Sequence, residues 1–287
     1  STSRRQRQMC IRDRYKITMR ILIVNKFLYL RGGDCTHSLN LKQLLRNAGH
    51  DVCFYAMSYS QNIVCEENKY FAEEISFSAK DLQGKIKAAN RIIWGIGVAQ
   101  NFKKLLDEFQ PDVVHLNNIH SYLSPIVAKL AYQRGVKVIW TLHDYKLICP
   151  SYSCLCKGNT CEACFTDKKH VVLRKCMKNS FPASILAWGE AMNWNKNKLS
   201  LWTNSFICPS QFMAEKMQQG GYPATKLQVI SNFIGEEQVQ YIINTPNPIR
   251  EEAYAYIGRL SQEKGVESLL KAASRLPYKL YIAGSGP

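Results

Sequence analysis

Short apolar runs alternate with stretches of helical periodicity along most of the chain. Runs rich in apolar residues, typical of strands covered on both faces, occur at residues 20–25, 51–57, 112–116, 136–142, 205–210 and 227–232. Between these runs, helical spacing predicts helices at 36–50, 81–109, 124–135, 183–202 and 210–221. The alternation predicts an α/β fold in which helices cover both faces of a doubly wound parallel sheet.

A second series follows a polar stretch at 232–252 that contains Pro246 and Pro248 and is typical of a linker. Here "AYAYIGRL" predicts a strand, "KGVESLLKAASRL" a helix and "YKLYIAG" another strand. Two strands and one helix are too few to bury a sheet. We therefore expect one domain at 19–245, with a Cys-rich insertion at 149–176, and the truncated start of a second domain at 246–287.

The first residues of the chain differ in character from the rest. Residues 1–14 hold five Arg against one Asp and show no periodicity, and they lack the apolar core of a signal peptide. The stretch "MRILIV", which begins at Met19, resembles a natural start followed at once by a buried strand. We interpret residues 1–18 as a non-native tail resembling translated sequencing-adapter read-through, with a disordered basic tail as the alternative.

Charge and hydropathy narrow the partners and the compartment. The chain has 38 Lys and Arg against 22 Asp and Glu, a net charge of +16, which favours an anionic partner. No apolar run approaches the roughly 18 residues that a membrane-spanning helix needs. We expect a cytoplasmic protein, with peripheral contact to the inner face of the membrane as a further option, and a reducing compartment favours thiols or metal ligands over disulfides.

Residues just after the strands are the first candidates for chemistry, because ligands bind beyond the carboxyl ends of parallel strands. Gly32 and Gly33 follow the first strand and precede a helix, where backbone amides favour an anion such as phosphate. An ordinary strand-to-helix turn is the alternative. The pattern G-x-G-x-x-G is absent at this place, which weakens a dehydrogenase interpretation.

Histidines follow two further strands. In "TLHDYKLICP", His143 is placed to hydrogen-bond a substrate, and Asp144 to orient that imidazole. "HLNNIH" repeats the arrangement with His115 and His120 around Asn117 and Asn118. A structural role for each of these side chains is the alternative.

The second series places two cations beside a helix start. Arg259 directly follows a predicted strand and Lys264 begins the next helix in "YIGRLSQEKGVESLL". A guanidinium and an ammonium five residues apart at a helix amino terminus are suited to binding a diphosphate.

The stretch from 149 to 176 holds six of the eleven cysteines. Cys161 and Cys164 form a C-x2-C pair, and Cys149 and Cys176 flank it, each across an eleven-residue gap. Four thiolates bind zinc tetrahedrally, so we predict either a structural zinc site or free thiols. A zinc-stabilised nucleic-acid-binding protein is an alternative function, because "KKHVVLRKCMK" adds positive charge beside the cluster.

Aromatic and basic residues follow the cysteines. Trp188, Trp194 and Trp202 lie on or next to a predicted helix that also carries Lys196 and Lys198. This combination predicts either contact with an anionic membrane or packing of the indoles in the core.

Taken in order, these motifs resemble a family 4 retaining glycosyltransferase of the GT-B fold. The resemblance covers residues 19 to 287, and "GRL" followed by "EKG" is its most specific signature. The matching stretches are "MRILIVN" with the glycine pair, "LLRNAGHDV", "PDVVHLNN", "TLHDYKLICP", "CPSQFMAEKM", "VISNFI", "YIGRLSQEKGVESLL" and "IAGSGP".

The resemblance implies an acceptor-side Rossmann-like domain, followed by the start of a donor-binding domain. It implies that Arg259 and Lys264 neutralise the diphosphate of a nucleotide-diphosphate sugar, with Gly32 and Gly33 near that diphosphate. His143 would contact the transferred sugar, with no cofactor required. The acceptor would be a glycan or a lipid-linked molecule in cell-surface glycan biosynthesis, and no nucleic-acid partner is expected.

Two departures from the family pattern affect this expectation. Members often carry His at the position of Asn117, so Asn117 receives no catalytic role. The paired glutamates of the family, E-x7-E, would lie beyond Pro287, so we expect this chain to be inactive alone. A non-catalytic Rossmann-like scaffold is a further alternative.

Overall fold

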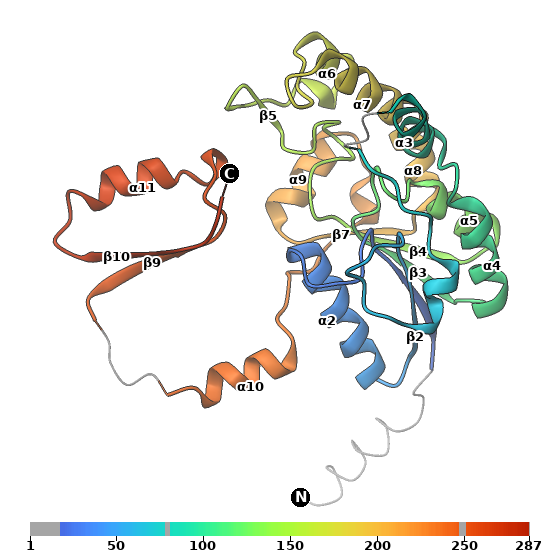
Figure 1. The fold of residues 1–287 in the computed structure, drawn as a ribbon, viewed down its shortest axis with the longest axis horizontal. Coiled ribbons are helices and arrows are strands. Elements are labelled where there is room, and N and C mark those ends of the chain that lie inside the picture. The colour runs from blue at the N-terminus through green and yellow to red at the C-terminus, as the bar shows by residue number, and fades with distance from the viewer. Residues whose placement is uncertain (1–17, 78–80, 247–250, 287) are drawn as a thin grey trace, which may run out of the picture. The chain divides into compact units, whose positions relative to one another are not determined.

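The computed structural model describes residues 18–77, 81–246 and 251–286, so all but one residue of the expected tail at 1–18 lie outside the described residues (Figure 1). Contacts divide the described chain into two units. The first runs to Cys154 and from Cys161 to Gly235, and the second comprises Leu155–Thr160 and the chain from Glu236 onward.

The first unit is built on a six-stranded, wholly parallel sheet with the order β2-β1-β3-β4-β7-β8. Its strands are β1 (Arg20–Val24), β2 (Asp51–Tyr55), β3 (Val113–Leu116), β4 (Lys137–Thr141), β7 (Ser205–Cys208) and β8 (Leu227–Val229). The predicted parallel α/β sheet is confirmed.

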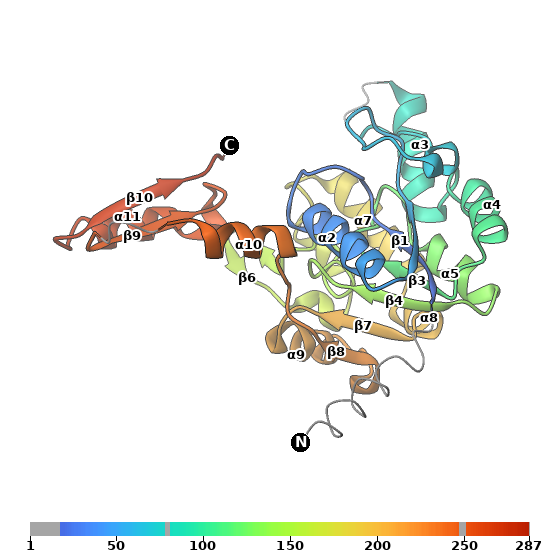
Figure 2. The same cartoon turned by 90° about the horizontal axis from the view of Figure 1, so that it is seen from below.

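Helices cover both faces of this sheet. The α-helices of the first unit are α2 (Gly33–Asn47), α3 (Leu82–Trp94), α4 (Ala99–Phe109), α5 (Ile126–Gln133), α6 (His170–Leu173), α7 (Phe181–Asn193), α8 (Lys196–Trp202) and α9 (Gln211–Gln219). Figure 2 shows α2 on one face of the sheet and α4 and α5 on the other. This arrangement explains why the central strands are apolar on both sides.

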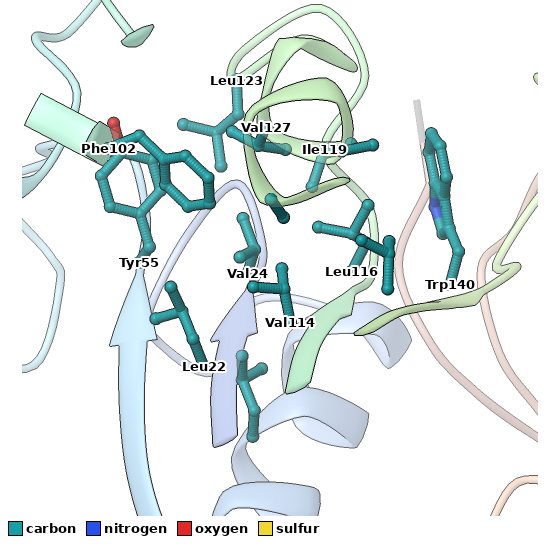
Figure 3. Packing of buried hydrophobic residues seen from close by; sticks show 14 of the residues in the cluster. Leu22, Val24, Tyr55, Phe102, Val114, Leu116, Ile119, Leu123, Val127 and Trp140 are labelled. Carbon is teal, nitrogen blue, oxygen red and sulfur yellow. The ribbon is translucent and has the colours of Figure 1, made fainter. Parts of the chain in front are cut away.

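The core lies between the central strands and the α5 region. Figure 3 shows Leu22 and Val114 on neighbouring strands, with Val127 of α5 above them, and all three side chains are fully buried. Tyr55 at the end of β2 packs edge-on against Phe102 of α4 at 4.9 Å, and its hydroxyl donates to the Val98 carbonyl. These contacts fix the carboxyl ends of the strands relative to the helices.

The single long helix predicted at 81–109 is wrong, because the chain breaks between α3 and α4. Gly95 and Gly97 have φ angles of +70° and +82°, which side chains rarely adopt. The break presents the Ile96 carbonyl to the fully buried Arg91 guanidinium, which also donates to the Tyr122 and Glu73 carbonyls. Three carbonyl acceptors compensate the burial of this charge.

The helix predicted at 183–202 is also two helices. Trp194 ends α7, and the side chain of Asn195 accepts a hydrogen bond from the Lys198 amide and so begins α8. The Trp194 indole donates to the Ile92 carbonyl, so it packs in the core.

The second unit contains a parallel pair of strands, β9 (Ala253–Ile257) and β10 (Lys279–Ala283), connected by α11 (Val266–Ala273). The expected linker at 232–252 includes the helix α10 (Glu236–Asn244). A short antiparallel hairpin, β5 (Leu155–Cys156) with β6 (Asn159–Thr160), lies within the Cys-rich insertion and is grouped with this unit.

The break after α3 generates a test of packing. A Cβ at Gly95 would lie 2.5 Å from Ile126, whereas at Gly135, with the nearly equal φ of +71°, it would meet nothing within 4 Å. We expect Gly135→Ala to lower the free energy of unfolding by about 1 kcal/mol through backbone strain alone. Gly95→Ala should cost at least about 2 kcal/mol more because Ile126 must move. Urea denaturation measures both; equal losses would contradict the assigned contact.

Candidate ligand site at the carboxyl ends of the strands

The strand order reverses between β1 and β3, and the loops after these two strands are tied together. The Lys26 amide donates to the Asn118 carbonyl at 3.0 Å, and the Asn118 amide donates to the buried Asn25 side chain at 3.1 Å. Ligands of open parallel sheets bind at such a reversal, outside the carboxyl ends. The arrangement therefore locates a candidate site at this edge of the first unit.

The glycine pair begins helix α2 beside this edge. Gly32 is the N-cap residue, with no side-chain cap, and Gly33 is the first helical residue. A Cβ at Gly33 would meet nothing within 4 Å, so the first unit itself leaves this backbone open to an approaching group. Asp34 in the same turn forms an ion pair with Lys26 at 3.2 Å, which places both signs of charge at the helix start.

His143 is held by Asn117. Its Nε2 lies 3.0 Å from the Asn117 side-chain oxygen, so in this pairing Nε2 carries the proton and Nδ1 accepts. The expectation that Asp144 orients His143 is wrong, because Asp144 Oδ1 instead accepts from the Lys146 amide at 2.8 Å and shapes the loop. Asn117, given no catalytic role from sequence, is the residue that positions the imidazole.

His37 of α2 belongs to the same cluster and was missed by sequence reasoning. Its ring lies 5.2 Å from the ring of His143 and 5.3 Å from that of Phe233. Neither ring nitrogen, both of them buried, has a hydrogen-bond partner among the described residues. The available signal was its place near the start of the helix that follows the glycine pair.

Burial keeps these histidines neutral. It lowers the pKa of His143 to about 4, with a further contribution from His37, and it also lowers the pKa of His37. His115, which lies 2.8 Å from the Thr141 hydroxyl, has a pKa lowered to about 3 by burial. His120 stacks on Trp140 and its pKa is likewise lowered. His115 and His120 therefore serve the packing of the strand ends.

His37, Asn117 and His143 together form what we call the strand-end cluster. A cavity of about 180 Å³ lies beside it, between the insertion and helices α7 and α8. The Lys146 ammonium crosses it to Glu190 at 2.8 Å, and both side chains are buried. Lys168, another wall residue, donates to the Ile148 carbonyl at 2.6 Å. The buried ion pair joins the loop after β4 to α7.

The four predicted zinc ligands do not lie as one set. Cys149 pairs with Cys154, whose thiol hydrogen bond lowers the pKa of Cys149 to about 5. Cys164 is buried in a small apolar cluster against which Cys176 packs, and Cys161 accepts a hydrogen bond from Arg174.

Within residues 18–77, 81–246 and 251–286, no group of three or more His, Cys, Asp or Glu side chains is arranged to hold a metal ion. The thiols as they lie therefore do not fit a zinc ion, and structural zinc stays a prediction. Likewise, none of the described helices combines the length and the apolar character needed to cross a bilayer.

The two predicted diphosphate ligands belong to the second unit, whereas Gly32, Gly33 and His143 belong to the first. Arg259 follows β9, and its exposed guanidinium lies 3.7 Å from Glu263. Lys264 is one residue before Gly265, whose φ of +67° opens α11. Lys264 thus stands immediately before the amino terminus of α11, and Arg259 lies in the turn between β9 and that helix.

Comparison with known proteins identifies a family model. The model of Glycosyltransferase Family 4 matches residues 31–238. An uncharacterized 42.6 kDa protein in the cps region of Klebsiella pneumoniae is 25% identical over 194 residues, which are 67% of this chain and 44% of that protein. An uncharacterized glycosyltransferase of Methanosarcina acetivorans is 36% identical over 107 residues, 34% of this chain and 28% of that protein.

Solved structures share the fold at low identity. The lipopolysaccharide outer core galactosyltransferase WaaB has a TM-score of 0.50 at 18% identity, covering 93% of this chain and 61% of that one. Anabaena HepE in complex with UDP and glucose has a TM-score of 0.51 at 14% identity, covering 94% and 62%. The chain thus spans about three fifths of these structures and less than half of the curated relatives.

The lowered pKa of His143 predicts how the free energy of unfolding depends on pH. Its folded pKa, about 4, lies below the ordinary 6.5, so the unfolded chain binds a proton first as pH falls. The free energy of unfolding should therefore decrease as pH drops from about 6.5 to about 4, and be fully retained above that window. His143→Gln should reduce this slope by about 1.4 kcal/mol per pH unit. Urea unfolding across the window measures it, and an unchanged slope would contradict the burial argument.

Proposed function

The chain belongs to glycosyltransferase family 4, and from that premise we propose that it takes part in transfer of a sugar from a nucleotide-diphosphate sugar, with retention of anomeric configuration. The family match over residues 31–238 carries this proposal. The strand-end cluster supports it, because the open backbone at Gly33 and the neutral His143 follow β1 and β4 at the carboxyl edge of one sheet, and His37 of α2 contacts His143.

The donor diphosphate would be neutralised by Arg259 and Lys264. Charge on a leaving diphosphate is stabilised by cations and by helix amino termini, and both features stand together after β9. The amides at Gly33 would add hydrogen bonds from the first unit. HepE, which shares the fold, was solved with UDP and with UDP-glucose, so uridine nucleotides are the first probes.

His143 would contact the transferred sugar. With its Nε2 proton directed at Asn117, the neutral ring offers Nδ1 as an acceptor to a sugar hydroxyl. A charged imidazolium would lack this acceptor, so the lowered pKa supports the role. In retention, the acceptor hydroxyl attacks the anomeric carbon from the face of the leaving diphosphate, the bond to the diphosphate breaks, and a diphosphate oxygen takes the hydroxyl proton.

The acceptor would be a glycan or a lipid-linked molecule of cell-surface glycan biosynthesis, in the cytoplasm or at the inner face of the membrane. The descriptions of two similar proteins support this acceptor class. One relative is a protein in a cps region, and WaaB is a lipopolysaccharide outer core galactosyltransferase.

Donor binding tests the diphosphate ligands. The Arg259 and Lys279 side chains are 70% and 71% exposed, and each has a carboxylate within 3.7 Å, so the two cations are matched in exposure and in ion pairing. We expect Arg259→Ala to weaken binding of UDP-glucose, or of the best ligand among uridine, guanosine and adenosine diphosphate sugars, by about tenfold or more. Lys279→Ala should leave it unchanged. Calorimetric titration measures both; equal affinities would exclude Arg259 from the site.

Gly33→Ala separates a ligand role from a structural role. Because a Cβ has open space and Ala favours helix, the variant should keep or raise the free energy of unfolding, by up to about 1 kcal/mol. If the diphosphate approaches this backbone, affinity for the same nucleotide sugar should nevertheless fall about tenfold. Thermal unfolding and calorimetry give the two readouts. A stable variant with unchanged affinity would remove Gly33 from the donor site.

A further inference from the structure

Helix α7 exposes apolar side chains along its whole length. Phe181, Ile185, Trp188 and Met192 are 51%, 43%, 38% and 51% exposed, and Pro182 is exposed beside them. The three spacings of 4, 3 and 4 residues place these four side chains on one stripe about 16 Å long. Every exposed residue of this fully described helix is apolar. A surface of this kind marks an interaction site.

The inner face of α7 is already occupied by the protein. Ser184, Ala187 and Glu190 are buried against the insertion and the loop after β4. The Asn193 side chain donates to the Ile93 carbonyl at 2.6 Å, next to the Trp194 bond to Ile92, so α7 is fixed on the end of α3. Figure 1 shows the two helices at the same edge of the first unit. The stripe therefore faces outward because the opposite face is packed.

Positively charged residues flank the stripe in the sequence. Between Asp167 and Glu215 the sequence contains one acidic residue, Glu190, and that carboxylate is buried in its pair with Lys146. In the sequence, exposed cations precede the stripe at Arg174, Lys175 and Lys178 and follow it at Lys196 and Lys198. An exposed apolar stripe between cations, with exposed acids absent from this segment, is complementary to an anionic lipid surface.

We propose that the outer face of α7 (Phe181, Ile185, Trp188 and Met192) docks on an anionic lipid bilayer. The helix would lie in the plane of the interface with its apolar side chains among the acyl chains and the flanking cations at the headgroups. Trp188 suits this depth, because an indole has an apolar body and a polar N–H. Of the two alternatives that the sequence left open for the tryptophans, Trp194 and Trp202 follow core packing, because both are buried and pack against each other.

The surface is independent of the donor site. It rests on exposure and charge alone, so failure of the proposed transferase would leave it untouched, and its own failure would not affect donor binding. If both hold, the docked helix would bring the enzyme to acceptors that are anchored in lipid.

Vesicle co-sedimentation tests the proposal. At low salt the 287-residue chain should bind vesicles of phosphatidylcholine mixed with phosphatidylglycerol and not vesicles of phosphatidylcholine alone. The double variant Ile185→Ser/Trp188→Ser should bind at least about tenfold more weakly. Phe212→Ser, which changes a 57% exposed aromatic residue on α9, is the matched control and should bind as the parent does. Thermal unfolding of each variant checks that it is folded.

The charge is tested separately by Lys175→Glu/Lys178→Glu, which should weaken binding to the anionic vesicles and reduce its salt dependence. Failure of the parent chain to bind at low salt would overturn the proposal, as would undiminished binding by Ile185→Ser/Trp188→Ser. A concentration-dependent dimer that the same double variant abolishes would assign the stripe to a second copy of the chain and overturn it as well.

Discussion

The buried side chain of Asn25 holds together the two loops on which the candidate site depends. Its oxygen accepts the Asn118 amide, and its nitrogen donates to the Phe27 carbonyl at 3.2 Å. It also approaches Cys35 of α2 at 3.5 Å. One amide thus links the loop after β1, the loop after β3 and the helix that begins at the glycine pair. Because Asn25 is fully buried, its side-chain amide needs these hydrogen-bond partners, and an unpaired polar group at this place would destabilise the fold.

That constraint explains the character of the strand-end cluster. Because the loops close tightly over the sheet, His37 and His143 are desolvated and stay neutral, and Asn117 rather than a carboxylate holds the imidazole. The cations proposed to bind the diphosphate stand instead on exposed positions of the second unit, where Arg259 is well hydrated before any ligand arrives. The first unit thus carries a desolvated cluster of hydrogen-bonding side chains, and the second unit carries solvent-exposed cations.

Sequence patterns predicted the parts of the molecule that local periodicity controls. All six strands of the first unit follow from apolar runs, and the helix predicted from residue 210 begins at Gln211, whereas α2 begins at Gly33, three residues before the predicted start at 36. The breaks at Gly95 and Trp194 were missed, because periodicity does not show the contacts that stabilise them: Ile126 and the buried Arg91 side chain at the first, and the distant Ile92 carbonyl at the second. His37 was missed for the same reason, since only the fold brings α2 beside the loop after β4.

The Cys-rich insertion packs against the inner face of α7. Cys164 and Val171 form a small apolar cluster with Ala187 of α7, and Lys146 reaches from the preceding loop to Glu190 on the same helix. These contacts fill the inner face of α7 and leave its apolar outer face without a cover in the first unit. A structural brace of this kind needs burial and hydrogen bonds, which the thiols already make, whether or not a metal ion is added. The insertion therefore helps to position α7, the helix that carries the proposed lipid-docking face.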